Sequence, residues 1–279
     1  MSQLKIVMLS GGPGKRVWPL SDTSMPKQYL PVLDGPGGEP ESMVQRLWRQ
    51  LLAADLMESA SVATSTKQAA WIKEQLGRHV PLLEEPAQRG SYSAALLAAS
   101  YYYSVAGVSP HEIIVMLPVD MYVSGDFFHC IRSLPKLLRE NEAPMMMVGT
   151  SAEYPGTRYG YILADQAELG EESSNYDWRV RSCCEKPGEL EAEELFRSGA
   201  LWNSGVYAFQ LDFLLGRLTD AALPIDYEEL YKQYFMLPKL SLEDGLACDA
   251  SVDKSVIRYD GLWVNLNSWR TLSERIAMP

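Results

Sequence analysis

The segment Ile6-Val7-Met8-Leu9-Ser10-Gly11-Gly12-Pro13-Gly14-Lys15-Arg16 joins a short apolar run to three glycines and two cations. A short apolar run that ends at turn residues predicts a buried strand, here one that leads into a glycine loop. Glycine lets the backbone approach a ligand closely, and successive amides of such a loop bind anions. The spacing fits neither a Walker loop nor GxGxxG, so a plain loop stays an alternative. The position after the first strand favours phosphate binding, with Arg16 able to clamp phosphate oxygens.

Strand and helix patterns alternate about four times over residues 1–150. Buried strands are predicted at residues 6–9, 61–65, 80–83, 113–117 and 145–148, and helices at residues 43–57, 67–76, 93–105 and 127–139. This alternation predicts a parallel sheet with helices on both faces. Ligands of such sheets lie beyond the carboxyl ends of the strands, where the glycine loop and Asp120 are expected.

The pattern changes after residue 150. Strands are predicted at residues 159–164, 180–184, 206–210 and 256–264, and helices at residues 191–197, 226–235 and 268–277. We expect this part to complete the sheet and to add a small lid-like subdomain. The predicted fold class is α/β, with a Rossmann-like, mixed and mostly parallel sheet flanked by helices.

The length of 279 residues allows one large domain or about two. A chain that is 47% hydrophobic and 22% charged is typical of globular proteins, which excludes a mostly disordered chain. The formal net charge of −11 gives no general basis for binding nucleic acid or an anionic membrane. Any phosphate must therefore be bound by a few local cations and by backbone amides.

The four cysteines form no CxxC pair, and with only three histidines a zinc site is not expected. Reduced, mostly buried thiols are predicted instead. The sequence has neither a signal-peptide layout nor an apolar stretch of the roughly 18 residues that a membrane span needs. A cytoplasmic location without membrane contact is the expectation.

Lys27, in Pro26-Lys27-Gln28, belongs to a proline-stiffened loop on the same side of the sheet as the glycine loop. A lone lysine is most often a solvated surface charge. A second cation that faces a phosphate chain is the alternative.

A series of motifs follows in order along the chain. It comprises Leu9-Ser10-Gly11-Gly12-Pro13-Gly14-Lys15-Arg16-Val17-Trp18-Pro19-Leu20-Ser21, Pro26-Lys27-Gln28-Tyr29-Leu30, Glu85-Pro86-Ala87-Gln88-Arg89, Leu117-Pro118-Val119-Asp120, Tyr159-Gly160-Tyr161-Ile162, Glu185-Lys186-Pro187, Leu201-Trp202-Asn203-Ser204-Gly205-Val206-Tyr207 and Trp263-Val264-Asn265-Leu266-Asn267-Ser268-Trp269. In these motifs the sequence resembles the sugar-phosphate nucleotidylyltransferases, and in particular their mannose-1-phosphate guanylyltransferase branch. The resemblance covers residues 4–272, nearly the whole chain.

The resemblance implies a fold of the nucleotide-diphospho-sugar transferase type, with one domain over residues 1–279. Residues 1–150 would form the nucleotide-binding half, and residues 151–279 the sugar-binding half with its small subdomain. It also implies the reaction NTP + sugar 1-phosphate → NDP-sugar + pyrophosphate, with Mg²⁺, GTP as the leading nucleotide and GDP-mannose or a related GDP-sugar as the leading product. Both reactants are anions, so positioning and charge neutralisation should dominate catalysis.

The resemblance also assigns roles to single residues. The catalytic residues would be Arg16, Lys27 and Asp120. The nucleotide would be bound by Leu9, Gly11, Gly12, Gly14, Lys15, Arg16, Glu85, Arg89 and Ser91. The sugar phosphate would be bound by Gly160, Glu185, Lys186, Asn203 and Arg158, and the metal by Asp120 and Asn265.

Several positions depart from the family pattern. Asn265 stands where a second metal carboxylate is expected, and Met121 stands where a histidine usually follows Asp120. Gly90-Ser91-Tyr92-Ser93 replaces the usual Asn-Thr-Ala-Pro, which weakens the case for guanine. Arg158 replaces a glycine, and it would either meet an extra negative group on the acceptor or remain a solvated charge.

Two functions follow from these observations. An active nucleotidylyltransferase, with conventional or altered specificity, is favoured by the cations and Asp120. A weakly active nucleotide-sugar-binding regulator is favoured by Asn265 and Met121. Because the sequence stops at Pro279, no fused isomerase domain is expected. A homodimer stays open, since the sequence carries no signal for the oligomeric state.

Overall fold

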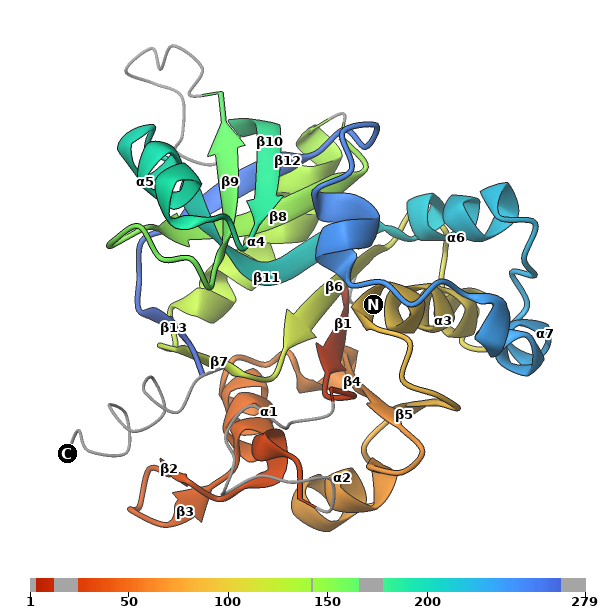
Figure 1. The fold of residues 1–279 in the computed structure, drawn as a ribbon. Coiled ribbons are helices and arrows are strands. Elements are labelled where there is room, and N and C mark those ends of the chain that lie inside the picture. The colour runs from red at the N-terminus through yellow and green to blue at the C-terminus, as the bar shows by residue number, and fades with distance from the viewer. Residues whose placement is uncertain (1–3, 13–24, 142, 166–177, 267–279) are drawn as a thin grey trace.

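The structure is a computed structural model that describes residues 4–12, 25–141, 143–165 and 178–266. Its centre is a nine-stranded sheet with the strand order β5-β4-β1-β6-β11-β8-β12-β10-β9 (Figure 1). The strands are β1 (Leu4–Leu9), β4 (Ala60–Ser65), β5 (Leu82–Glu85), β6 (Ile113–Pro118), β8 (Met145–Ser151), β9 (Gly160–Ala164), β10 (Trp178–Glu185), β11 (Leu201–Gln210) and β12 (Ser255–Tyr259).

The sheet is mixed and mostly parallel, as the sequence predicts. Strands β5, β4, β1 and β6 form a continuous parallel block. Beyond that block, β11 and β10 run antiparallel to their neighbours, and the other seven strands share one direction. The first strand lies near the middle, so the glycine loop leaves the sheet between two parallel neighbours.

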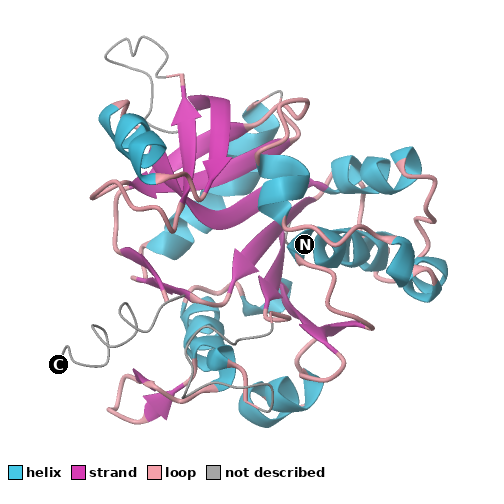
Figure 2. Cartoon of the chain, viewed as in Figure 1, coloured by secondary structure: helices cyan, strands magenta, loops and turns pink. Residues whose placement is uncertain are grey.

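Helices cover both faces of the sheet (Figure 2). Leu4, Ile6 and Met8 of β1 point to one face, in the same apolar cluster as residues of α1, α2 and α4, whereas Val7 points to the face covered by α3, α6 and α7. This split follows from the two-residue period of a strand. The helices are α1 (Met43–Ala53), α2 (Ala69–Leu76), α3 (Ser91–Ser104), α4 (Phe127–Glu140), α5 (Glu189–Arg197), α6 (Leu211–Asp220) and α7 (Tyr227–Lys232), with short turns η2 (Lys27–Tyr29), η3 (Met57–Ser59), η4 (Tyr234–Met236) and the π-helical turn η5 (Glu243–Ala247).

The predicted strand at residues 256–264 is two strands in different sheets. The chain leaves the large sheet after β12 and re-forms as β13 (Trp263–Asn265), which pairs antiparallel with β7 (Met121–Val123). A second small ribbon joins β2 (Leu33–Asp34) to β3 (Pro40–Glu41). The β7–β13 ribbon sets Asn265 opposite Met121, directly after Asp120.

The sequence prediction missed helix α6, although Leu211, Leu214, Leu215 and Leu218 carry the helical spacing and are buried. The predicted helix at residues 268–277 lies outside the described residues. Within the described part of the chain, no helix is long and apolar enough to cross a membrane.

The conformation of Gly90 lets the N-terminal end of α3 pack closely against the segment before η5. Its backbone has a φ of +92°, and a Cβ there would overlap the carbonyl oxygen of Leu240. Only glycine adopts this conformation without strain. The close approach lets Ser91 accept a hydrogen bond from the Leu242 amide at 2.8 Å. It therefore sets the position of η5, which lines the site described next.

Candidate active site

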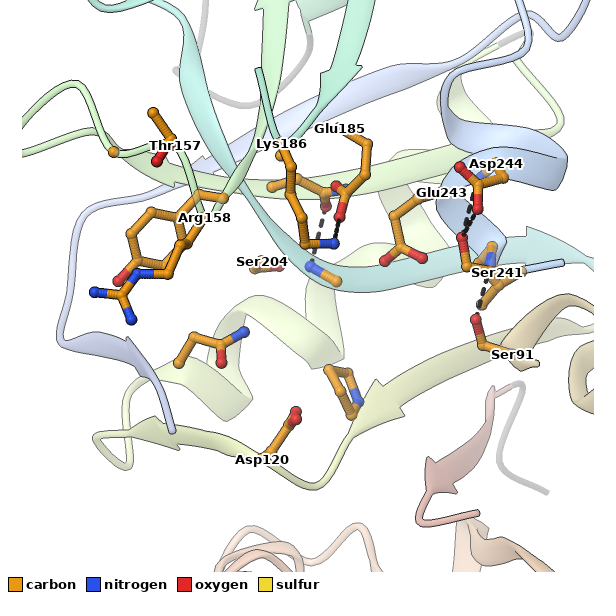
Figure 3. A pocket seen from close by; sticks show the side chains of 18 of the residues that line it. Ser91, Asp120, Thr157, Arg158, Glu185, Lys186, Ser204, Ser241, Glu243 and Asp244 are labelled. Atoms are coloured by element: carbon orange, nitrogen blue, oxygen red, sulfur yellow. Dashed lines mark hydrogen bonds and ion pairs between the residues drawn. The ribbon is translucent and has the colours of Figure 1, made fainter. Parts of the chain in front are cut away.

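A cleft of about 1190 Å³ lies where the predicted site residues converge (Figure 3). Its volume exceeds that of a typical drug-sized pocket and suits two ligands side by side. Among the residues that line it are nine that the sequence prediction assigned to the site: Leu9, Ser91, Asp120, Arg158, Gly160, Glu185, Lys186, Asn203 and Asn265. Leu9, which precedes the glycine loop, lines this cleft, and Lys27 contacts Asp120 in its lining.

Glutamine side chains hold the described start of the glycine loop. The Nε2 of Gln28 donates to the carbonyls of Ser10 and Gly12, both at 3.0 Å. Gln68 donates to Gly12 at 3.0 Å, and Gln88 donates to Gly11 at 2.8 Å. Because the C=O and N–H of a trans peptide point in opposite directions, the Gly11 amide is directed away from Gln28.

Gly14, Lys15 and Arg16, which the sequence prediction placed on phosphate, lie outside the described residues. Their predicted roles stay predictions. The glutamine contacts were not predicted. Gln28 belongs to a quoted motif, but nothing in the local sequence pairs Gln68 or Gln88 with the loop.

Lys27 and Asp120 form an ion pair at the edge of the cleft. The Lys27 Nζ lies 2.9 Å from the Asp120 Oδ2, with the two side chains 8% and 22% exposed. Lys27 is therefore no solvated surface charge. The same ammonium lies 3.5 Å from the Leu266 carbonyl, and the Leu266 amide donates to the Asp120 carbonyl at 2.8 Å. The cation is thus tied to the carboxylate and to the end of β13.

Glu185 and Lys186 extend from the end of β10 over the opposite wall of the cleft and form an ion pair (Figure 3). Lys186 has a φ of 51°, a conformation that costs a non-glycine residue about 1–3 kcal/mol and that clusters at functional sites. Its side chain is about half exposed. An ammonium held in this way can meet an incoming phosphate.

Gly160 packs closely under this pair. A Cβ at residue 160 would lie 2.5 Å from the Glu185 Oε2 and 3.3 Å from the Asn203 Cβ. Glycine is needed at position 160 because a side chain would not fit there. The backbone φ of Gly160 is not positive, so conformational freedom is not the reason.

On the sequence prediction that Gly160, Glu185 and Asn203 bind a sugar phosphate, the Gly160→Ala variant should displace Glu185 and lower the catalytic efficiency toward that predicted substrate. A shift of about 1 Å at a reacting site costs roughly 10–100-fold in kcat/KM. The KM for the predicted nucleotide substrate should change much less. Initial rates with each substrate varied in turn would measure both. The matched control is Gly188→Ala, where a Cβ meets nothing within 4 Å. Equal losses in the two variants would contradict the assignment.

Asn203 belongs to a buried hydrogen-bond chain that sequence reasoning did not predict. Its Nδ2 donates to the Tyr207 hydroxyl at 2.7 Å, and that hydroxyl donates to the Glu243 Oε1 at 2.9 Å. The Asn203 Oδ1 accepts from the Gly205 amide at 3.0 Å. Burial raises the pKa of Glu243 and, well above its usual value, that of Tyr207. The chain fixes the Asn203 amide and couples it to η5.

The cleft walls are rich in carboxylates. Asp120, Glu185, Glu189, Glu193, Glu243 and Asp244 line it, against the cations Arg158 and Lys186. Carboxylates accept hydrogen bonds and suit the hydroxyl groups of a sugar. Arg158 is exposed, and it lies at one side of the cleft in Figure 3. Within the described cleft, an anionic ligand would therefore be met by Arg158 and Lys186, which line it, and by Lys27, which pairs with Asp120.

Glu85, Arg89 and Ser91 make structural contacts between the end of β5 and the start of α3. Glu85 is buried and accepts from the Tyr234 hydroxyl at 2.5 Å, and burial raises its pKa to about 7. A Cβ on Gly11 would lie 2.7 Å from the Glu85 Oε1. The Arg89 Nε donates to the Leu237 carbonyl at 2.6 Å. Each thus has a structural contact besides its predicted role in nucleotide binding.

Comparisons with known proteins identify the family. The family model described as "Nucleotidyl transferase" matches residues 5–234, so the chain belongs to the nucleotidyl transferase family. The chain is 31% identical to the alginate biosynthesis protein AlgA of Pseudomonas aeruginosa over 76% of its own length. It is 25% identical over 96% of its length to a mannose-1-phosphate guanylyltransferase of Salmonella montevideo.

A solved structure has a similar fold over the whole chain. It is described as a mannose-1-phosphate geranyltransferase from Thermus thermophilus, with a TM-score of 0.78 and 28% identity, and the match covers 100% of this chain and 80% of that one. The chain spans about half the length of the curated relatives it matches, namely 43% of the Pseudomonas protein and 59% of the Salmonella protein.

Proposed function

We propose that the protein makes a nucleoside diphosphate sugar from a nucleoside triphosphate and a sugar 1-phosphate, with release of pyrophosphate. The observation that carries this proposal is the Lys27–Asp120 pair at one side of the cleft, with Lys186 and Glu185 at the other. GTP and mannose 1-phosphate are the leading substrates, because two of the relatives are described as acting on mannose 1-phosphate. On this proposal residues 1–150 bind the nucleotide and residues 151–279 bind the sugar.

The proposed reaction is an in-line displacement at the α-phosphorus. A phosphate oxygen of the sugar phosphate forms the new P–O bond, and the bond to the β-phosphate oxygen breaks. Pyrophosphate leaves with that electron pair. Lys27 neutralises charge that develops at the α-phosphate, and Lys186 holds the attacking phosphate. Glu185 and Asn203 accept or donate hydrogen bonds to sugar hydroxyls, which orients the nucleophile.

The residues around Asp120 fit a magnesium ion. Mg²⁺ is bound by one or two carboxylates together with substrate phosphates, and here one carboxylate and the Asn265 amide oxygen line the same cleft. No group of three or more His, Cys, Asp or Glu suited to a metal occurs among the described residues, so substrate oxygens would complete the coordination. When bound, the ion would supply charge neutralisation at the triphosphate. Asp120 and Asn265 would hold it.

A pyrophosphate-release matrix tests the proposal. Each of the four common NTPs would be combined with a panel of sugar 1-phosphates, with Mg²⁺ or with a chelator. We expect release only when nucleotide, sugar phosphate and metal are all present, with the highest rate for GTP and mannose 1-phosphate. No release with any combination would contradict the proposal. A clear preference for another pair would keep the reaction and change the specificity.

Asn265→Asp separates an ordinary enzyme from a weakly active nucleotide-sugar-binding homologue. A second carboxylate should lower the Mg²⁺ concentration for half-maximal rate by about tenfold, because ligand charge tunes the affinity for such cations. The control Asn141→Asp adds the same charge at the end of α4, away from the cleft. Titrating Mg²⁺ against the initial rate measures the effect. If the protein is a weakly active homologue, Asn265→Asp should raise kcat strongly. A turnover of about 1 s⁻¹ or faster in the unmodified chain would exclude this alternative.

A cytoplasmic location and a homodimer belong to the same proposal. The homodimer stays a prediction that size-exclusion chromatography with light scattering would test.

A further inference from the structure

Two cysteines from distant parts of the sequence meet beside the cleft. The Sγ atoms of Cys183 and Cys248 are 3.1 Å apart, although 65 positions separate them in the chain. A disulfide bond is about 2.05 Å long, so the two sulfurs need to approach by only about 1 Å. Cys183 belongs to β10, and Cys248 caps the end of η5. Both are partly exposed, which leaves a route for a small reagent.

The surroundings favour a reactive thiol at one member of the pair. The hydrogen bond between the two thiols lowers the pKa of Cys248 and raises that of Cys183. The ammonium of Lys254 is buried beside them and donates to the carbonyls of Leu246 and Asp249. A nearby cation stabilises a thiolate, and the thiolate is the nucleophile in disulfide exchange. Cys248 is therefore the better attacking group.

The other two cysteines lack these features and serve as internal references. Cys184 lies 3.3 Å from the Glu191 Oε1, and burial together with this carboxylate raises its pKa to about 11. Cys130 packs against the apolar core under α4, and burial raises its pKa to about 12. Among the described residues, neither has a sulfur contact like that between Cys183 and Cys248. Both should react with disulfides more slowly than Cys248 does.

We propose that Cys183 and Cys248 are a redox-reactive dithiol pair, which a low-molecular-weight disulfide such as oxidised glutathione converts into an intramolecular disulfide. The Cys248 thiolate attacks one sulfur of the reagent, forms a mixed disulfide and expels one thiolate. Cys183 then loses its proton and attacks the Cys248 sulfur. The new S–S bond expels the second glutathione thiolate, so two electrons pass from the protein thiols to the reagent.

The bond would tie together two walls of the cleft. Cys183 lies two residues before Glu185, at the end of β10. Cys248 directly follows η5, whose first residue, Glu243, accepts the Tyr207 hydrogen bond. The disulfide should therefore restrict η5 relative to β10. This prediction is about the mobility of the backbone, so it does not depend on whether the protein catalyses the proposed nucleotidyl transfer.

Mass spectrometry of the oxidised protein tests the pair. The full chain would be incubated with oxidised glutathione, quenched with an alkylating reagent and digested without reduction. We expect the alkylated thiols to fall from the four of the reduced chain to two. A peptide pair that links residues 183 and 248 should appear, and it should disappear after dithiothreitol. Hydrogen exchange of the oxidised chain should slow within residues 241–249.

Matched variants exclude other routes. The Cys130→Ser/Cys184→Ser variant keeps Cys183 and Cys248 as its two cysteines. After oxidation it should therefore show no alkylated thiol. The Cys183→Ser variant should stop at a glutathione adduct on Cys248. Four alkylated thiols after oxidation, a lasting adduct in the unmodified chain, or a disulfide that involves Cys184 would overturn the proposal. If hydrogen exchange within residues 241–249 is the same in the reduced chain and in a chain shown to carry the disulfide, the proposed effect of the disulfide on η5 is wrong.

Discussion

The Asp120→Asn variant is expected to turn over about 10³-fold more slowly than the unmodified chain. The proposed magnesium ion at this carboxylate would contribute several kcal/mol of charge stabilisation in the transition state, and each 1.36 kcal/mol changes the rate tenfold. The Asp120 carboxylate lines the cleft and forms an ion pair with Lys27. Initial rates of pyrophosphate release at saturating Mg²⁺ would measure the loss.

The same substitution should also destabilise the fold, because Lys27 loses its anionic partner in a niche where it is only 8% exposed. Breaking a buried ion pair costs about 3–5 kcal/mol, and the partial exposure of Asp120 puts the expected loss at roughly 2 kcal/mol. Urea unfolding would measure it. The surface control Glu84→Gln breaks the Lys73–Glu84 pair and should cost less than about 1 kcal/mol.

A double variant separates chemistry from folding. In Lys27→Met/Asp120→Asn both charges are absent, so most of the lost stability should return. Activity should stay at the level of the slower single variant. Recovery of activity along with stability would mean that Asp120 acts only through the fold.

The first half of the fold, over residues 1–150, was predictable because its signals are local. The run that became β1 ends at glycine, and α1 begins at Ser42 with a capping box to Gln45. Strands β4, β6 and β8 were predicted within a few residues of their bounds. The last third was harder, since Asp260, Gly261 and Leu262 divide what looked like one strand into β12 and β13.

The site was predictable through its motifs but not through its contacts. The distances that matter join residues far apart in sequence, as Lys27 and Asp120 do over 93 positions. Neither hydrophobic period nor composition encodes such a pairing. Tyr207 was quoted within a motif, yet its bond to Glu243 depends on the π turn of η5. The contact between Cys183 and Cys248 likewise joins residues that are far apart in the sequence, and it also depends on η5, which Cys248 follows directly.

The Lys27→Met variant should keep its nucleotide affinity and lose about 10²–10³-fold in kcat, the usual cost of removing one preorganised charge from a transition state. Methionine fills a similar volume, so the loss reports the ammonium rather than a cavity. Lys27→Arg should not restore the rate, because the wider guanidinium does not fit a niche in which the Lys27 side chain is only 8% exposed.

The matched control for Lys27 is Lys73→Met, which removes a lysine from an ion pair whose side chains are 47% and 35% exposed. It should leave kcat unchanged, because Lys73 on α2 and Glu84 on β5 do not line the cleft. Single-turnover rates with saturating GTP and mannose 1-phosphate separate chemistry from product release. If Lys27→Met lowered nucleotide affinity and left the single-turnover rate intact, Lys27 would be a binding residue, and charge neutralisation at the α-phosphate would have to come from the metal and from Lys186.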